Sequence, residues 1–549
     1  MSTNISAFSG FKFLYCLSKP GDLSFQHSLK GVERIQKNKL SKLLGLSENT
    51  EFGKRFGLSK AISYGEFTHK VPETDYEYWQ EMVDKQRKSD SLVISGQTPQ
   101  RYQPTSGSSA KIKWIPYTRM FLDELNKAIS AMLVNAFHQN KGILKGRHYW
   151  SISWIPTELR SIFDQDTHDD MKLLPWWKRK FINSTMVVPS SVATCKTSQG
   201  STIATLAYLA AAEDLALISV WSPTFALNLL DQLASYQDEI SLIIKYGHWG
   251  KWHNELAHLH PPQSKKASDI LKSWDGKVES RFLRELWPNL AMLSSWDSST
   301  SKIWAEKLKQ LFPWCDFLPK GLWSTEGVVS IFYNNSFPLA VNSHFLEFKD
   351  LDSGRIYPAW NLQQGQYLSP LLSTGSGFFR YNLKDRLLVT GHLKNCPCFE
   401  FQGREDTVDM VGEKMSSTIA LEVLQEVKAH FQVNALSLIA LSSKGMDKPG
   451  YLILCEHRQD PELEKKISNF AEELLVQSFH YNLAVEVGQL APLQALLTPW
   501  AQEIYQKRAQ NRNIVLGDMK IEPLILWDES DGSLDLTPQQ SREATAEHI

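Results

Sequence analysis

The sequence has few cysteines, no long apolar run and no excess of charge of either sign. Only six of its 549 residues are cysteines, and the spacing of the closest pair, Cys396 and Cys398, fits neither a zinc knuckle nor a redox pair. Lysine plus arginine (59) nearly equals aspartate plus glutamate (60), so the charge favours neither a nucleic acid nor an anionic membrane as partner. We therefore expect a protein of the reducing cytoplasm.

The sequence pattern also predicts neither a secretory signal peptide nor a membrane-spanning helix. Residues 1–8 lack a basic segment followed by an apolar run. The most apolar helix candidate, residues 201–220, is interrupted by Glu213 and Asp214, which predicts a core helix and not a membrane span. With 42% hydrophobic and 22% charged residues, the composition is typical of a soluble globular protein with more than one domain.

What the sequence does have is a small polar loop that leads into the run Ile115–Pro116. Small side chains let backbone N–H groups approach an anion closely, and hydroxyl groups add further donors. Lys111 and Lys113 follow, and either lysine could neutralise phosphate charge. The pattern predicts a phosphate-binding loop, whose small residues are Thr105, Ser106, Gly107, Ser108 and Ser109.

Other interpretations of this loop are possible from the residues alone. The spacing is not that of a Walker A loop. Ser108 and Lys111 match the S-x-x-K pattern of serine acylases, but no S-D-N or K-T-G partner follows. A plain polar surface loop is the remaining alternative, since such clusters mark turns in general. Elsewhere, His253, His258 and His260 do not form H-E-x-x-H, so no zinc site is expected there.

Helix and strand candidates alternate between the loop and about residue 400. Residues 148–153 are strand-like, and residues 202–212 are helix-like. Residues 215–221 form a continuous apolar run that is typical of a buried parallel strand. The alternation predicts an α/β fold with a large, mostly parallel sheet flanked by helices, and residues 249–267 are interpreted as a surface insertion.

The two ends of the chain differ from this pattern. Residues 20–95 are predicted to be mostly helical, with one helix over residues 64–82 and a short strand at 92–95. The charged segment 404–414 predicts a hinge. Beyond it we expect a small, mobile α+β domain with strands at 435–441, 451–455 and 483–487. The predicted domains are residues 1–404 and 405–549.

Four short segments at expected strand ends or turns carry complementary chemistry. They pair hydroxyl, carboxylate and lysine side chains with glycine, although a surface turn could explain any one of them. The segments are Gly321–Gly327, Arg380–Asp385, Arg404–Lys414 and Gly517–Lys520.

In this order and spacing, the segments resemble the motifs of the adenylate-forming superfamily. They resemble most closely the auxin-responsive (Gretchen Hagen) family of acyl acid-amido synthetases, over roughly residues 25–525. Departures occur at Lys111 and Lys384, where the family usually has glycine, and at Asn382, where arginine is usual. The matching segments are Thr105–Lys113, Trp323–Gly327, Tyr381–Asp385, Gly403–Asp406 and Gly412–Lys414.

The resemblance implies a nucleotide site with Mg²⁺. Thr325 would contact the α-phosphate of ATP, Glu326 would ligate Mg²⁺ and Asp385 would bind the ribose. Asp406 would be the pivot of the small domain, and Lys520 would reach the α-phosphate when that domain closes. Lys520, Glu326 and Thr325 would be the catalytic residues. The residues implied around ATP are Thr105, Ser106, Gly107, Ser108, Ser109, Lys113, Trp323, Ser324, Thr325, Tyr381, Asp385 and Arg404.

The implied activity is ATP-dependent adenylation of a carboxylic acid, followed by transfer of the acyl group to an amine, expected to be an amino acid. The products are an amide, AMP and pyrophosphate, and the enzyme is expected to be a monomer. Two alternatives stay open: a ligase that forms a thioester with coenzyme A or a carrier protein, and a nucleotide-binding protein without catalysis. The many tryptophans, including Trp150, Trp154 and Trp323, favour a flat aromatic or apolar acid.

Overall fold

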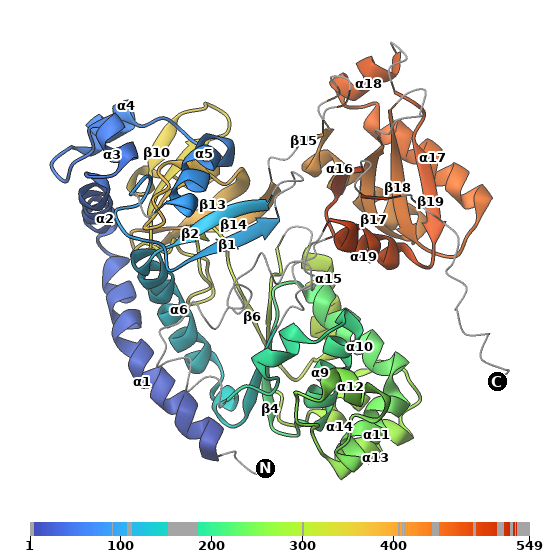
Figure 1. Ribbon diagram of the computed structural model, residues 1–549. Coiled ribbons are helices and arrows are strands. Elements are labelled where there is room, and N and C mark those ends of the chain that lie inside the picture. Colours follow the sequence, from blue (N-terminus) through green and yellow to red (C-terminus); the bar gives the residue numbers. More distant parts are fainter. Residues whose placement is uncertain are drawn as a thin grey trace. The chain divides into compact units, whose positions relative to one another are not determined.

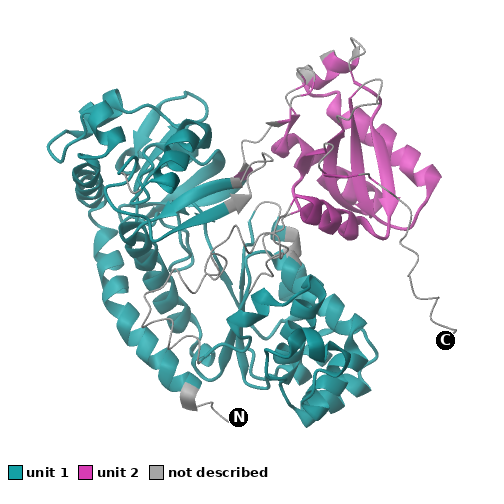
Figure 2. Ribbon diagram, in the orientation of Figure 1, with its two compact units in different colours: residues 1–402 teal, residues 403–549 magenta. Residues whose placement is uncertain are grey.

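The computed structural model falls into two compact units, residues 1–402 and residues 403–549 (Figure 2). The sequence predicts a division after residue 404, and the mobility of the smaller part stays a prediction. The structure describes residues 5–89, 92–106, 112–151, 185–298, 301–404, 407–408, 410, 413, 415–441, 449–486, 490–512, 521–527, 531–532 and 534.

Helices form the first part of the larger unit, and α1 lies along α6 (Figure 1). The predicted helix over residues 64–82 is in fact two helices. Val71, which precedes Pro72, has an extended backbone that ends α4, and Asp75 begins α5 by accepting a hydrogen bond from the Tyr78 N–H. The helices are α1 (Ile5–Ser28), α2 (Val32–Ser47), α3 (Glu51–Phe56), α4 (Tyr64–Lys70), α5 (Tyr76–Lys88) and α6 (Arg119–Gln139).

The strand predicted at residues 92–95 is wrong. The apolar side chains of Val93 and Ile94 are buried as expected, but their backbone groups have other partners. The carbonyl of Val93 accepts from the N–H of Phe52 at the start of α3, and the Ile94 N–H donates to the Gln86 side chain. A helix N-terminus and an amide side chain therefore take the hydrogen bonds that a neighbouring strand would have made.

A four-stranded parallel sheet follows, with the order β3-β4-β5-β6. Its strands are β3 (Arg147–Trp150), β4 (Leu215–Ser219), β5 (Met292–Ser295) and β6 (Asp316–Pro319). The predicted buried strand at residues 215–221 is thus confirmed as β4. The helices between these strands are α9 (Ser198–Ala211), α10 (Pro223–Ser235), α11 (Gln237–Tyr246), α12 (His253–Leu256), α13 (Lys265–Ser273), α14 (Ser280–Leu286) and α15 (Lys302–Leu311).

Residues 249–267 are not a surface insertion. Trp249 and Leu256 are buried within the core that covers the parallel sheet. The indole N–H of Trp249 donates to the carbonyl of Leu259 over 2.7 Å, which satisfies the buried donor. Polar residues dominate the composition of this segment and suggest an exposed position, but its few apolar side chains lie in the core.

The prediction of a mostly parallel sheet up to residue 400 is wrong beyond β6. A six-stranded sheet follows in which β9 pairs antiparallel with β10 and β11, and β11 pairs antiparallel with β12 and β13. The connections here are too short for the helical crossovers that parallel pairing requires. The strands after β6 are β7 (Trp323–Ser324), β8 (Gly327–Val328), β9 (Phe345–Asp350), β10 (Ile356–Pro358), β11 (Tyr367–Ser373), β12 (Tyr381–Asn382), β13 (Asp385–Leu393) and β14 (Cys396–Arg404).

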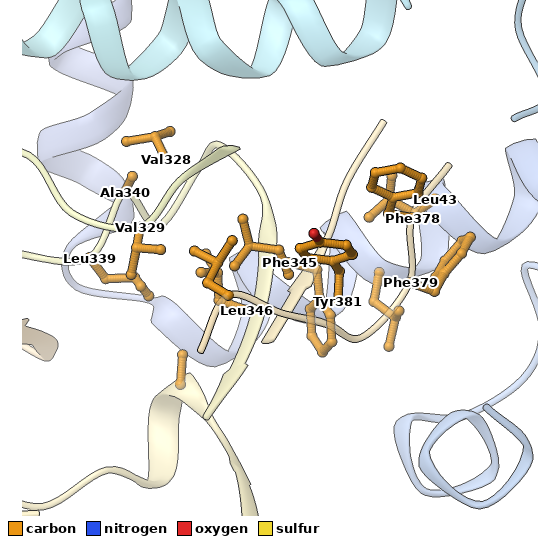
Figure 3. Packing of buried hydrophobic residues seen from close by; sticks show 14 of the residues in the cluster. Leu43, Val328, Val329, Leu339, Ala340, Phe345, Leu346, Phe378, Phe379 and Tyr381 are labelled. Atoms are coloured by element: carbon orange, nitrogen blue, oxygen red, sulfur yellow. The ribbon is translucent and has the colours of Figure 1, made fainter. Parts of the chain in front are cut away.

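One hydrophobic core joins this antiparallel sheet to the N-terminal helices. Phe345, Phe378 and Phe379 lie near Tyr381 in it, and Leu43 of α2 packs against the same cluster (Figure 3). The ring of Tyr381 stacks on that of Phe378 with centroids 5.3 Å apart. This packing fixes the Tyr381 ring within the sheet.

The smaller unit contains a four-stranded sheet with the order β19-β18-β17-β20. The strand predicted at residues 483–487 is wrong, because residues 479–486 are helical and the outer strands come later in the chain. None of the helices that the structure describes is both long and apolar enough to cross a membrane. The elements are β15 (Thr407–Val408), β16 (Met415–Ser416), α16 (Ser417–Phe431), β17 (Asn434–Leu441), β18 (Gly450–Glu456), α17 (Pro461–Leu475), α18 (Phe479–Glu486), β19 (Gln494–Thr498), α19 (Ala501–Asn511) and β20 (Leu524–Trp527).

Candidate active site

A tight hairpin presents the Ser-Thr-Glu-Gly segment. Trp323 pairs with Val328 and Ser324 pairs with Gly327, so Thr325 and Glu326 are the two residues of the turn. A two-residue turn leaves little freedom to the backbone that it carries. The segment therefore holds its hydroxyl and its carboxylate side by side at the end of a short ribbon.

Two tyrosines from other elements hold this turn. The hydroxyl of Tyr117, on strand β2 (Ile112–Tyr117), donates to the backbone carbonyl of Thr325 over 3.0 Å. The hydroxyl of Tyr381, on β12, donates to Glu326 Oε1 over 3.2 Å. Burial raises the pKa of Tyr381 above its ordinary value, and the Glu326 carboxylate raises it further. The phenol therefore stays protonated and keeps donating to Glu326.

Tyr76 lies between Lys113, whose ammonium faces its ring, and the charge of Glu326. The ammonium of Lys113 lies 5.7 Å from the centre of the Tyr76 ring, and the Tyr76 hydroxyl accepts a 2.6 Å hydrogen bond from the Trp114 N–H. Burial raises the pKa of Tyr76, and Glu326 is among the charges that act on it. Helix α5, strand β2 and the Thr325–Glu326 turn are thus brought together.

The predicted phosphate loop joins two paired strands. Thr105 lies opposite Lys113 and Ser106 opposite Ile112 in an antiparallel ribbon of β1 (Arg101–Ser106) and β2. Gly107, Ser108, Ser109 and Lys111 lie outside the described residues, so their phosphate contacts stay predictions. Asp406 and Lys520 also lie outside the described residues, and Arg404 is described only as the backbone end of β14.

The segment expected at the ribose carries an unusual backbone. Asp385 begins β13 and is buried, and its contact with ribose stays a prediction. Lys384, where the resembling family has glycine, adopts φ = 57°, a left-handed conformation that glycine adopts without strain. The Lys384 N–H donates to Asn382 Oδ1 over 2.7 Å, which holds this turn. The Lys384 ammonium lies 3.7 Å from Asp75.

An aromatic cluster with one buried lysine lies where three parallel strands end. Trp221 lies 5.4 Å from Trp296 and 6.4 Å from Trp323 between ring centroids. The ammonium of Lys320 lies 4.6 Å from the centre of the Trp221 ring and donates to Ser219 Oγ over 2.9 Å. Ligands of α/β sheets bind beyond the carboxyl ends of the strands, so this cluster is a candidate surface for the acid.

Tyr76, Tyr117 and Lys320 are not among the site residues expected from the sequence. Nothing in the local pattern separates the two tyrosines from other core aromatic residues, and only tertiary packing brings them to the turn. Lys320 had a weak signal, because a lysine that directly follows a buried strand is placed at the sheet edge where ligands bind.

The described residues fit a Mg²⁺ ion that is shared with ATP. Within the part of the chain that the structure describes, no three His, Cys, Asp or Glu side chains are placed to hold a metal by themselves. Mg²⁺ is usually held by one or two carboxylates together with substrate phosphates and water. Glu326, which accepts a hydrogen bond from Tyr381, would supply such a carboxylate.

Comparisons with known proteins identify the family of the chain. Residues 23–316 match the GH3 family N-terminal domain, and residues 337–404 match the GH3 family central domain. Among curated proteins of Arabidopsis thaliana, the chain is 21% identical over 485 residues to the 4-substituted benzoates-glutamate ligase GH3.12, covering 81% of this chain and 82% of that protein. It is 21% identical over 481 residues to the indole-3-acetic acid-amido synthetase GH3.15, covering 80% and 79%.

The fold is that of solved structures of this family. The chain superposes on GH3.15 acyl acid amido synthetase with a TM-score of 0.77 and 17% identity, over 92% of this chain and 94% of that one. It superposes on the same protein in complex with 2,4-DB with a TM-score of 0.78 and 16% identity, over 93% and 95%. Since the family's N-terminal domain alone spans more than half of the sequence, the chain belongs to the GH3 family of acyl acid-amido synthetases.

Proposed function

We propose that this chain adenylates an aromatic carboxylic acid with ATP at the Thr325–Glu326 turn and then joins the acyl group to the amine of an amino acid. AMP and pyrophosphate leave. The observation that carries the proposal is the convergence of the turn with Tyr381, Tyr117 and the strand that bears Lys113. These elements come from distant parts of the sequence, and together they offer a carboxylate, a hydroxyl and an ammonium group.

The chemistry explains why such groups are needed. A carboxylate that attacks the α-phosphate brings two anions together, so positive charge must offset the negative charge that gathers on the phosphoryl oxygens. Glu326 would hold Mg²⁺, which supplies part of that charge. The Thr325 hydroxyl would donate to an α-phosphate oxygen, and Lys113 would neutralise the phosphates beyond it. Tyr381 keeps the Glu326 carboxylate in one orientation.

The second step, in which the amine attacks the adenylate, requires that water be excluded and that the C-terminal region change its position. The acyl group of the adenylate carries a good leaving group, and water would compete with the amine for it. We propose that the C-terminal region moves between the two steps, so that Lys520 serves adenylation and then withdraws to admit the amine. Asp406 would be the pivot.

An aromatic acid and an amino acid agree best with the chain and its relatives. The printed names of the relatives include benzoates with glutamate and indole-3-acetic acid, and one solved relative holds 2,4-DB. In this chain, the indoles of Trp221, Trp296 and Trp323 offer flat apolar faces at the ends of the parallel strands. The nearby ammonium of Lys320 could pair with a carboxylate. We propose that the enzyme works as a monomer.

The test is a panel of carboxylic acids crossed with the amino acids and read as AMP release. We expect one group of aromatic acids to support pyrophosphate exchange, and a subset of amino acids to raise AMP release further. Mass spectrometry then identifies the product. The absence of exchange with every acid would leave a nucleotide-binding protein without catalysis, and product formation only with coenzyme A would replace the amide by a thioester.

A further inference from the structure

Three side chains that normally carry or exchange charge are buried together behind the Thr325–Glu326 turn. Lys39 of α2 is 8% exposed, Glu124 of α6 is 1% exposed and His344, just before β9, is fully buried. The Lys39 ammonium lies 3.5 Å from Glu124 Oε1, and His344 Nδ1 lies 2.8 Å from Glu124 Oε2. Burying such groups is costly, and apolar side chains of similar size would fill the space at least as well. Packing alone therefore does not explain why these three side chains are buried here.

Glu124 is the centre of this cluster and holds the imidazole in one orientation. Burial alone would raise the pKa of Glu124, but Lys39, His344 and the Gly375 N–H outweigh it and hold the pKa below its usual value. An ionised carboxylate only accepts hydrogen bonds, so His344 Nδ1 donates. The ring also stacks on Phe121, with centroids 5.5 Å apart. These contacts leave the imidazole little freedom to rotate.

The opposite edge of the imidazole faces the catalytic turn. A Cβ atom added to Gly327 would lie 2.9 Å from His344 Nε2 and 2.7 Å from Leu372 Cδ2, so a side chain at residue 327 would need the ring to move. His344 Nε2 is buried and has no hydrogen-bond partner among the described residues. A buried polar atom without a partner is unfavourable, and such atoms persist where the geometry serves a function.

We propose that His344 is a positioning residue for the Thr325–Glu326 turn, fixed by Glu124 and Lys39 on one edge and supporting Gly327 with the other. Among the described residues, the side chains of Tyr117 and Tyr381 donate hydrogen bonds to the turn. Without the imidazole, the β7–β8 hairpin can move into the space that the ring occupied, and the Glu326 carboxylate moves with the hairpin. Groups that bind a metal tolerate only about 0.5 Å of displacement, so a small shift matters. The inference rests on the proposed role of Glu326 in binding Mg²⁺.

The test compares the Mg²⁺ dependence of ATP binding, measured by calorimetry, in His344→Asn and in the native protein. Asparagine can still donate to Glu124 but leaves the space beneath Gly327 empty. We expect ATP binding without Mg²⁺ to change less than twofold, and the Mg²⁺ concentration for half-maximal enhancement to rise about tenfold, as is typical when support of a metal ligand is lost. If His344→Asn does not fold, Glu124→Leu should give the same change, because leucine cannot accept the hydrogen bond from Nδ1 that holds the ring.

Two controls make the result specific. His148→Asn is the same substitution at another buried histidine, one that stacks on Phe11 and bonds the carbonyl of Ile143, and it should leave the Mg²⁺ dependence unchanged. Gly327→Ala should impair Mg²⁺ binding less when His344→Asn is also present, because the two residues compete for one space. An unchanged Mg²⁺ dependence in His344→Asn and Glu124→Leu overturns the positioning role, provided that Glu326→Gln abolishes the enhancement. If Glu326→Gln has no effect either, the proposed function itself fails.

Discussion

His148 lies in the parallel sheet of the larger unit and His344 lies beside the antiparallel sheet, and both imidazoles are fully buried. His148 stacks on Phe11 and bonds the carbonyl of Ile143 over 2.7 Å, so its surroundings are apolar and its polar edge meets a backbone group. His344 instead contacts the carboxylate of Glu124, and its other edge lies beside Gly327, which follows the Thr325–Glu326 turn.

The arginines of the two regions differ in the same way. Arg147 makes a two-pronged contact with Asp214 at the start of β3, where its side chain is 33% exposed. Arg380 pairs with Glu347 over 3.0 Å, with the two side chains 6% and 0% exposed, and also donates to the carbonyl of Val71. The Arg147–Asp214 pair of the parallel region is thus partly exposed, whereas the Arg380–Glu347 pair of the antiparallel region is buried. A substitution of charge should therefore affect the two regions very differently.

The largest expected effect on stability follows from Arg380→Met. The Glu347 carboxylate would stay buried without its cation, and we expect the free energy of unfolding to fall by about 3–5 kcal/mol. Arg147→Met is the matched control in the parallel region and should cost at most about 1 kcal/mol, because that pair is partly solvated. Urea denaturation measures both. Equal losses of unfolding free energy in the two variants would contradict the distinction between the regions. Recovery of that free energy in Arg380→Met/Glu347→Leu would support it.

The largest expected effect on the reaction rate comes from a residue outside both the parallel and the antiparallel region. Lys520→Ala should slow adenylation by about 10²–10³-fold, because a cation that offsets charge in the transition state is lost. ATP binding, measured by calorimetry, should survive. Pyrophosphate exchange measures the adenylation step. An unchanged exchange rate would show that Lys520 is not the lysine of this step, and the catalytic groups would then have to be sought around the Thr325–Glu326 turn alone.

A pH effect should follow from the apolar surroundings of His148. Burial lowers the pKa of its imidazole from 6.5 to about 3. Between these values, the unfolded chain binds a proton that the folded chain does not bind, so acidification favours unfolding by about 1.4 kcal/mol per pH unit. From pH 7 to pH 5, His148→Gln should therefore lose roughly 2 kcal/mol less than the native chain does. The same dependence of unfolding free energy on pH in the two proteins would mean that this imidazole is protonated in the folded state.

The smallest effect is expected at the turn before Asp385. Lys384→Gly should stabilise the protein by about 0.5–1 kcal/mol, because glycine adopts the left-handed backbone without strain. The partly exposed pair of Lys384 with Asp75 contributes little against this gain. Thermal unfolding measures the change. A loss of stability would mean that the pair with Asp75 outweighs the strain, and a change in ATP affinity would show that Lys384 acts on the nucleotide.

Much of the parallel region could be predicted from the sequence. The run 215–221 contains enough adjacent apolar residues to specify a strand that is buried on both faces, and β4 lies there. The antiparallel region was harder because its strands are short and several are hairpins, so periodicity over a few residues could not establish their direction. The same limit explains the wrong strand prediction at residues 483–487, because this apolar run is compatible with a short helix as well as with a strand.

The sequence by itself determined the chemistry of the turn. A hydroxyl, a carboxylate and a glycine in the order Thr325, Glu326, Gly327 already define what the segment can bind. Only the tertiary structure decided how that turn is held. Tyr117, Tyr381 and His344 come from separate elements and meet it through packing, and the glycine is required because the His344 ring and the Leu372 side chain occupy the space of a side chain. The physical reason is that a motif fixes which groups are near along the chain, whereas burial and contact depend on residues that are distant in sequence.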